Sequence, residues 1–269
     1  QILGREMDEV IVGGNSSLNL MYDTVARAML HGVEDGCKPW SKYDRVSFLC
    51  PVPGYDRHFA ICEYFGINMI NVPLNPDGPD MDLVESLVSQ DETIKGIWCV
   101  PKYSNPSGYT YSDATVRRFA ALRPKARDFR VFWDNAYVLH DFTDTPDTLL
   151  DVFAEAEKHG NEDLFYEFAS TSKITYPGAG VACISASRRN IRRILSELKY
   201  QTIGHDKMNQ LRHARVFPDI NDVLAQMQRH MELIRPKFEL LYRIFDEELS
   251  ALPEVRWTKP NGGYFICMT

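Results

Sequence analysis

"LFYEFASTSKITYPGAG" (residues 164–180) begins as an apolar run, passes through three hydroxyl residues and reaches Lys173 before a turn rich in proline and glycine. The apolar run predicts a buried strand, and the hydroxyls mark the point at which this strand ends. A second run, "FRVFWDNAYV" (129–138), also predicts a strand that ends in polar residues, the first of which is Asp134. An apolar strand followed by a polar turn is the pattern that indicates the fold.

Similar strands alternate with amphipathic helical segments as far as residue 187. The expected strands cover 9–14, 45–53, 68–74, 94–108 (running into a turn), 129–138, 164–173 and 181–187. The expected helices cover 16–30, 56–66, 80–90 and 112–123, with Asp80 and Ser112 as N-caps. Such alternation requires right-handed crossovers and a mostly parallel sheet. The sequence therefore predicts an α/β fold.

The remainder of the chain has a different pattern. Residues 190–204 and 220–252 are helical in character, and Pro236 is expected to kink the longer segment. Residues 255–268 predict the start of a smaller α+β layer. We therefore expect a large domain over 1–230 and the beginning of a second domain over 231–269. The chain starts without methionine and stops inside a strand-like run, so we expect a fragment or a chain missing both ends.

Composition narrows the class of protein. The 269 residues carry a net charge of −7 and a pI near 5.5, which argues against a general nucleic-acid binder or a membrane-surface protein. No apolar stretch reaches the length of a membrane span, and no signal peptide opens the chain. The six cysteines contain no CxxC pair, so we expect reduced thiols, no metal site and a cytoplasmic location.

Polar segments follow five of the predicted strands. They are Gly13–Ser17, Pro53–Tyr55, Asn105–Gly108, Asp134–Tyr137 and Ser170–Lys173. In a parallel sheet, ligands collect outside the carboxyl ends of the strands. We therefore expect these five segments to converge on one site.

Each segment taken alone also has an ordinary interpretation. "GGNSS" (13–17) suits an anion at a helix N-terminus but equally suits a serine-capped junction. "NPSG" (105–108) is a typical turn. Asp134 ends a buried strand, where an unpaired carboxylate is costly, so it either caps the next turn or meets a cation such as a ring nitrogen.

Lys173 has three possible interpretations: a loop lysine, the partner of a serine nucleophile, or an amine that bonds a carbonyl cofactor. The spacing Ser170-x-x-Lys173 matches the serine–lysine motif of penicillin-binding proteins, which also requires SDN and KTG. The nearest strings are "SDA" at 112–114 and "TKP" at 258–260, so this interpretation is disfavoured. Desolvation lowers a lysine pKa and frees the amine as a nucleophile, which suits the third interpretation.

The order of these motifs resembles the fold-type I pyridoxal-phosphate (PLP) enzymes, in particular the class I aminotransferases. "GGNSSL", "PGYDRH", "NPSG", "DNAY" and "STSKITYPGAG" are most similar to a divergent bacterial subgroup that is aspartate-aminotransferase-like. The resemblance runs from Gly13 to "PNGGYF" (260–265). It implies a PLP-dependent transferase large domain, with a mostly parallel central sheet and helices on both faces, plus part of a small α+β domain. It also implies a homodimer.

The same resemblance implies roles for individual residues. Lys173 would hold PLP as an aldimine and then serve as the general acid/base. Asp134 would pair with the pyridinium nitrogen, Tyr137 and Asn105 would hydrogen-bond the ring phenolate, and Tyr55 would stack on the ring. The residues that would hold the phosphate are Asn15, Ser16, Ser17, Ser170 and Ser172.

The chain departs from the family pattern in two places. The family carries a phosphate-binding arginine eight residues after the lysine, where this chain has Val181, and no Arg or Lys occurs between Lys173 and Arg188. The family's arginine for the substrate α-carboxylate would lie beyond Thr269. Three basic residues remain without an assigned role and are either ligands for a distal substrate carboxylate or a solvated or subunit-contacting helix face: Arg212, His213 and Arg215.

We therefore expect a PLP-dependent transaminase that moves an amino group between an amino acid, of the aspartate/glutamate type, and a 2-oxo acid. Within the same cofactor class, the alternative is a C–S lyase or a decarboxylase. A different class is a non-catalytic effector-binding protein that keeps the PLP scaffold, or an inactive truncated paralogue. The chain has no basic DNA-binding segment, which disfavours a transcription regulator.

Overall fold

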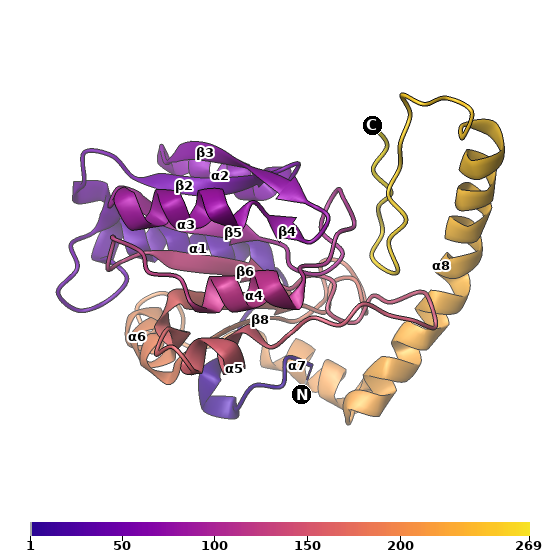
Figure 1. Cartoon of the computed structure of the whole chain (residues 1–269). Helices are drawn as coiled ribbons and strands as arrows, with labels where there is room; N and C mark the ends of the chain where they lie inside the picture. The colour runs from indigo at the N-terminus through magenta and orange to yellow at the C-terminus, as the bar shows by residue number, and fades with distance from the viewer. Residues whose placement is uncertain (1) are drawn as a thin grey trace.

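Eight strands form one sheet in the order β1-β8-β7-β6-β5-β2-β3-β4 in the computed structural model, which describes residues 2–269 (Figure 1). The strands are β1 (Val10–Val12), β2 (Ser47–Val52), β3 (Asn68–Asn75), β4 (Gly78–Pro79), β5 (Ile94–Cys99), β6 (Arg130–Asp134), β7 (Phe165–Ser170) and β8 (Ala182–Ala186). From β7 through β6, β5 and β2 to β3, every neighbouring pair is parallel. β8 runs antiparallel to both β7 and β1. The predicted α/β fold with a mostly parallel sheet is confirmed.

Helices cover both faces of this sheet (Figure 1). The α-helices are α1 (Ser17–His31), α2 (Asp56–Phe65), α3 (Met81–Gln90), α4 (Asp113–Ala120), α5 (Val152–Glu157), α6 (Arg188–Leu198), α7 (Lys207–Val216) and α8 (Ile220–Glu248), and short 3-10 helices cover Met7–Glu9, Trp40–Lys42 and Glu162–Leu164. The predicted N-caps are confirmed, since Asp80 accepts from the backbone N–H of Leu83 and Ser112 from that of Thr115.

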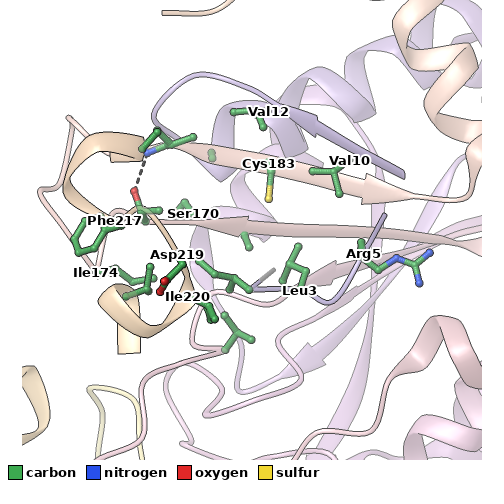
Figure 2. Close-up of a pocket in the computed structure, with 18 residues that line it drawn as sticks. Leu3, Arg5, Val10, Val12, Ser170, Ile174, Cys183, Phe217, Asp219 and Ile220 are labelled. Atoms are coloured by element: carbon green, nitrogen blue, oxygen red, sulfur yellow. Dashed lines mark hydrogen bonds between the residues drawn. The ribbon is translucent and has the colours of Figure 1, made fainter. Parts of the chain in front are cut away.

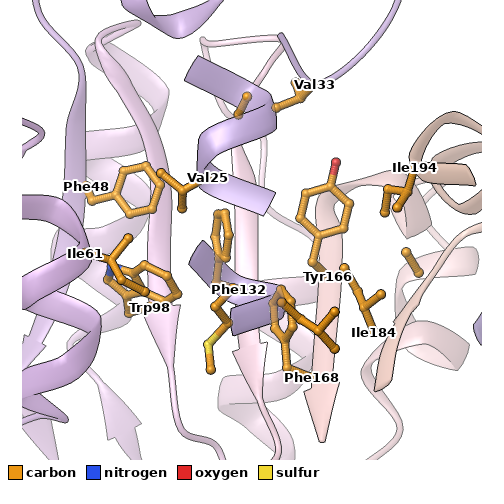
Figure 3. Close-up of a cluster of buried hydrophobic side chains, with 14 of the residues drawn as sticks. Val25, Val33, Phe48, Ile61, Trp98, Phe132, Tyr166, Phe168, Ile184 and Ile194 are labelled. Carbon is orange, nitrogen blue, oxygen red and sulfur yellow. The ribbon is translucent and has the colours of Figure 1, made fainter. Parts of the chain in front are cut away.

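Alternation of side chains along the strands builds two separate cores. Phe132 in β6 lies on one face with Trp98 and Phe168, where α1, α2 and α6 cover it (Figure 3). Its neighbour Trp133 lies on the other face, under α3, α4 and α5. All five residues of β6 are buried, as expected for a central parallel strand covered on both sides. The rigid strands fix where the turns at their carboxyl ends begin.

The segment after β8 agrees only in part with the sequence prediction. The helix expected over 190–204 is shorter, since α6 ends at Leu198. Beyond it, the Thr202 side chain hydrogen-bonds both the N–H and the C=O of Gly204. Such local side-chain hydrogen bonds compete with helix continuation. α8 continues through Pro236 and bends along its length (Figure 1). It also runs unbroken across residue 230, and the division into two domains there stays a prediction.

The C-terminal segment doubles back on itself between the sheet and α8 (Figure 1). Its expected α+β layer is represented by one antiparallel bridge, Trp257 to Met268, flanked by backbone hydrogen bonds between Arg256 and Thr269. Among the described residues, no helix is both long and apolar enough to cross a membrane. Within 2–269, the six cysteines are free, and no group of three or more His, Cys, Asp or Glu side chains is arranged to hold a metal ion.

Candidate active site

The polar segments that follow the strands do meet beyond the carboxyl ends of the sheet. The Ser172 hydroxyl donates to the carbonyl of Asn15 over 3.2 Å, which joins the first segment to the last. Lys173 Nζ lies 4.7 Å from the centre of the Tyr137 ring. Tyr55 packs in the same aromatic cluster as Tyr137. Four predicted segments are thereby brought together around the lysine amine.

Asp134 is a deeply buried carboxylate of this site. Its side chain is buried, and Oδ2 lies 3.0 Å from Nε2 of His58. The His58 ring is itself stacked on Trp98, with ring centres 4.5 Å apart and planes 12° from parallel. The other carboxylate oxygen, Oδ1, is buried and has no hydrogen-bond partner among residues 2–269. A buried oxygen of this kind is costly unless a ligand supplies a donor.

His58 is a site residue that the sequence prediction missed. It lies in the first turn of α2, three residues after Tyr55, and it fixes the orientation of the Asp134 carboxylate. The sequence contained a signal for it, because His58 follows the predicted site residue Tyr55 by one helical turn. A histidine in this place can reach the Asp134 carboxylate at the end of a neighbouring strand.

Lys173 lies in the turn that follows β7, partly shielded from solvent. Burial lowers the pKa of its amine below the ordinary lysine value, because desolvation disfavours the charged form. The negative charge of Asp134 opposes this shift and raises the pKa. The net lowering increases the fraction of neutral, nucleophilic amine compared with a surface lysine.

Tyr137 and Asn105 also meet at this site. Burial raises the pKa of the Tyr137 phenol, the charge of Asp134 raises it further, and a hydrogen bond with the Asn105 side chain opposes the rise. Tyr137 therefore stays protonated and can donate a hydrogen bond. The Tyr55 ring stands edge-on to His58, with centres 5.0 Å apart, at the start of α2.

The predicted phosphate-binding residues surround the N-terminus of α1, with differing roles. Ser16 caps the helix by accepting from the N–H of Asn19 over 3.4 Å. Asn15 Nδ2 donates to the carbonyl of Gly178 over 2.6 Å, so this side chain ties the lysine turn to α1. Ser17 is the first residue of the helix. The free N–H groups and the dipole of a 15-residue helix favour an anion at this end.

Ser170 is the last residue of β7 and pairs with Ala182 of β8, whose backbone also bonds Gly13 and Gly14 just before α1. It lines a cavity of about 520 Å³ between the β8–β1 edge of the sheet and the start of α8 (Figure 2). Most of the wall is apolar, including Ile174 and Phe217. At Val181, where the family places an arginine, the backbone N–H donates to Thr171 Oγ1 over 2.8 Å.

Two further residues at the site gave no clear signal in the sequence. His140 is buried between Tyr137 and Tyr264, with ring centres 5.6 and 5.5 Å away. Within the described part of the chain, neither of its ring nitrogens has a hydrogen-bond partner. Burial lowers the pKa of His140 to about 3, and the charge of Lys173 contributes. Tyr264, within the "PNGGYF" segment, donates from its hydroxyl to the Lys173 carbonyl over 3.3 Å.

The three basic residues left open by the sequence separate in the structure. Arg212 and Arg215 are exposed on α7. His213 is partly buried and hydrogen-bonds the hydroxyls of Thr171 and Thr175. Its contact is therefore with the turn that carries Lys173.

The curated proteins that this chain resembles include two that are named as aminotransferases. A protein of Mycolicibacterium smegmatis named only as an aminotransferase is 50% identical over 268 residues, covering 100% of this chain and 63% of that protein. The aspartate aminotransferase of Corynebacterium glutamicum is 44% identical over 267 residues, covering 99% of this chain and 62% of that protein. This chain thus spans less than two thirds of the length of either relative.

Solved structures agree with these relatives. A crystal structure of an aspartate transaminase from C. glutamicum superposes with a TM-score of 0.96 at 44% identity, over 99% of this chain and 63% of that one. An α-aminoadipate aminotransferase from Thermus thermophilus, complexed with N-(5'-phosphopyridoxyl)-L-leucine, shares the fold with a TM-score of 0.78 at 21% identity, over 99% and 62%. The sequence model of the family described as aspartate amino-transferase matches residues 1–269. The chain belongs to this aspartate amino-transferase family.

Proposed function

We propose that the protein is a PLP-dependent transaminase that moves an amino group between an amino acid and a 2-oxo acid. The observation that carries the proposal is the buried, unpartnered Oδ1 of Asp134 at the site that also holds the Lys173 amine. A carboxylate oxygen shielded from water needs a cationic or N–H donor, and the protonated ring nitrogen of PLP is such a donor.

The residues present fit the other groups of PLP as well. Its carbonyl carbon needs a neutral amine, and burial lowers the pKa of Lys173. Its phenolate oxygen needs donors, and Tyr137 stays protonated because burial raises its pKa. When bound, PLP supplies an electron sink for negative charge that develops on the substrate carbon.

The protein residues then have separate tasks. Lys173 Nζ would hold the cofactor and would serve as the group that takes and returns the proton of the substrate carbon. His58 holds Asp134 in place through Oδ2 and leaves Oδ1 for the ring nitrogen. Tyr55, which packs against His58 and the Tyr137 cluster, would stack on the cofactor ring.

The phosphate site in this proposal uses the helix N-terminus more than side-chain cations. Ser16, Ser17 and the first N–H groups of α1 supply donors, and Asn15, Ser170 and Ser172 complete the proposed set. Asn15 and Ser172 also join α1 to the lysine turn. Val181 takes the position of the family arginine, so backbone donors and the helix dipole carry more of the binding.

For the substrate, we propose an amino acid of the aspartate/glutamate type. The 44% identity with the C. glutamicum protein named aspartate aminotransferase supports this choice. We also propose a homodimer in the cytoplasm, with a large PLP-binding domain over 1–230 and a small domain that begins at 231. Size-exclusion chromatography with light scattering tests the dimer.

The activity is tested with the full-length protein. Aspartate plus 2-oxoglutarate should give oxaloacetate and glutamate, and each amino acid alone should change the visible spectrum of the bound cofactor. Cystathionine should give no thiol, which separates a transaminase from a C–S lyase. Lys173→Ala is the control and should be inactive. Bound cofactor with no spectral change for any amino acid would overturn the proposed activity and favour an effector-binding protein.

A further inference from the structure

Side chains of α7 hydrogen-bond the turn that carries Lys173. We call residues 171–181 the lysine loop. Asn209 Nδ2 donates to the carbonyl of Gly180 over 2.8 Å and to that of Ala179 over 3.0 Å. One helical turn later, His213 Nε2 lies 3.2 Å from Thr171 Oγ1 and 3.1 Å from Thr175 Oγ1. α7 thus contacts both ends of the lysine loop.

Thr171 is the residue on which the lysine loop closes. Its N–H donates to the carbonyl of Val181 over 2.8 Å, and the N–H of Val181 donates back to Thr171 Oγ1 over 2.8 Å. Its carbonyl accepts from the N–H groups of Ile174 and Thr175, at 2.9 and 2.8 Å. The orientation of Thr171 therefore sets where the chain places Lys173, two residues later.

The hydrogen bonds fix the tautomer of the neutral His213 ring. Nδ1 lies 2.9 Å from the carbonyl of Asn209, which can only accept, so Nδ1 carries the proton and Nε2 of the neutral ring is an acceptor. The Thr175 hydroxyl is placed to donate to the carbonyl of Thr171 over 3.1 Å. The Thr171 hydroxyl then has Nε2, at 3.2 Å, as its nearer acceptor and Thr175 Oγ1, at 3.3 Å, as the other, while its own oxygen accepts from Val181.

We propose that His213 is a positioning residue for Lys173, acting through Thr171. By accepting a hydrogen bond from the Thr171 hydroxyl, His213 holds a side chain that joins the two ends of the lysine loop. This inference rests on the proposed function, because positioning matters only if Lys173 bonds a cofactor. If it holds, the position of Lys173 in the site depends on α7, a helix that begins 34 residues later in the chain, at Lys207.

Protonation of His213 reverses the direction of this hydrogen bond. Nε2 then becomes a donor, and Thr171 has to give its own proton to another acceptor. The titratable and charged groups around the ring are Arg212 on α7, Tyr176 on the lysine loop and His230 on α8, which line the same cavity of about 550 Å³. Lys173 lies on the inner side of the lysine loop. A shift in the pH dependence at Lys173 is therefore the specific signature of this role.

The test uses the full-length protein loaded with PLP and compares His213→Ala, His213→Gln and Thr171→Val. The controlling readout is the pH midpoint of the visible absorbance of the cofactor bound to Lys173. His213→Ala should move this midpoint and lower kcat by ~10–100-fold with KM changed less than about twofold, because a displaced amine reacts more slowly. His213→Gln keeps an acceptor near Nε2 and should restore part of both.

The coupling to Thr171 gives a second, independent readout. If His213 acts through Thr171, the double variant H213A/T171V should show no larger midpoint shift than either single variant. His230→Ala is the matched control. His230 lines the same cavity, its Nε2 lies 2.9 Å from the Gln226 side chain, and among the described residues it has no hydrogen bond with the lysine loop. It should keep the wild-type midpoint and kcat.

The outcomes separate this inference from the proposed function. A wild-type spectrum with no cofactor bound to Lys173 overturns the proposed function, and the positioning role with it. A normal wild-type spectrum with an unmoved midpoint and unchanged kcat in His213→Ala overturns only the positioning role. The same conclusion follows if His213→Ala loses activity only in proportion to its bound cofactor, or if the shifts of the two single variants add.

Discussion

The Asp134 end and the Lys173 end of the site are built in different ways. Asp134 is the last residue of a buried strand, and its immediate support is a histidine stacked on a tryptophan of the next strand. Lys173 lies in a partly exposed loop that is held by the side chains of Asn15, just before α1, of His213 in α7 and of Tyr264.

This difference separates two physical tasks. The carboxylate has to stay fixed and shielded, and a core of rigid rings provides that environment. The lysine has to bond, release and carry protons, and a loop held by individual hydrogen bonds allows such movement at a modest cost per bond. We therefore expect changes at the Asp134 end to have large effects and changes around the lysine loop to have graded ones.

The largest effect is expected from Asp134→Asn. The amide keeps the shape of the side chain but removes the charge that would hold the ring nitrogen protonated. We expect kcat to fall by about 10²–10³-fold, the range seen when one electrostatic contact to a reacting centre is removed. Stopped-flow absorbance of the cofactor with excess aspartate measures this.

The control for this variant is Asp246→Asn, at an exposed carboxylate. Asp128→Asn is unsuitable as a control because Asp128 pairs with buried Lys95. Equal losses in both variants would contradict a special role for Asp134.

Phe132→Ala tests the core on which the Asp134 end rests. Phe132 is fully buried, with its ring 4.6 Å from that of Trp98 and 5.4 Å from that of Phe48. Its removal should lower the free energy of unfolding by ~3–5 kcal/mol, from lost burial and the cavity left behind. Urea denaturation measures the change. Leu233→Ala, on an exposed face of α8, should stay within ~0.5 kcal/mol of wild type. A similar loss in both would show that this core does not dominate stability.

The electrostatic link between the two ends has a definite sign. Burial lowers the pKa of Lys173 and the Asp134 charge raises it. Removing that charge in Asp134→Asn should therefore lower the pKa further, so that the amine stays neutral to a lower pH. Competitive acetylation of cofactor-free protein over a pH series, read on the Lys173 peptide, measures this. His58→Gln, which keeps the carboxylate, should give a smaller shift. A profile that moves to higher pH in Asp134→Asn would contradict the assigned causes.

The smallest effect is expected from Tyr264→Phe, which removes the hydroxyl that donates to the Lys173 carbonyl. The loss of one partly exposed hydrogen bond should cost ~0.5–1.5 kcal/mol. Hydrogen exchange followed by mass spectrometry should show faster exchange in the lysine loop, with strands β5 and β6 unchanged. Tyr176→Phe, at an exposed ring of the same loop, is the control. Faster exchange throughout the sheet would mean that Tyr264 supports the whole fold.

The sequence predicts the Asp134 end better than the Lys173 end, and the reason is physical. The apolar runs in the sequence show where each strand of a parallel sheet ends. Asp134, Tyr137 and Lys173 follow such strand ends, so they could be predicted to lie together. The position of His58 could have been predicted in the same way, because it lies in the first turn of α2, the helix that Tyr55 precedes.

The supports of the lysine loop could not be found in this way. The His213 contact with Thr171 joins residues 42 positions apart through side chains, and no periodicity encodes it. His140 follows an expected site motif but gives no pattern that would predict a buried ring between two tyrosines. The helix expected to continue to residue 204 ends at Leu198, and Thr202 beyond it forms a local turn with Gly204.

The account depends most directly on Lys173 as the residue that bonds the cofactor. Borohydride reduction of the full-length protein with bound PLP, followed by peptide mass mapping, tests this in one measurement. We predict a single stoichiometric pyridoxyl mass on the peptide that contains Lys173, and no adduct in Lys173→Ala. A stoichiometric adduct on another lysine, or an adduct that persists in Lys173→Ala, would contradict the proposed site.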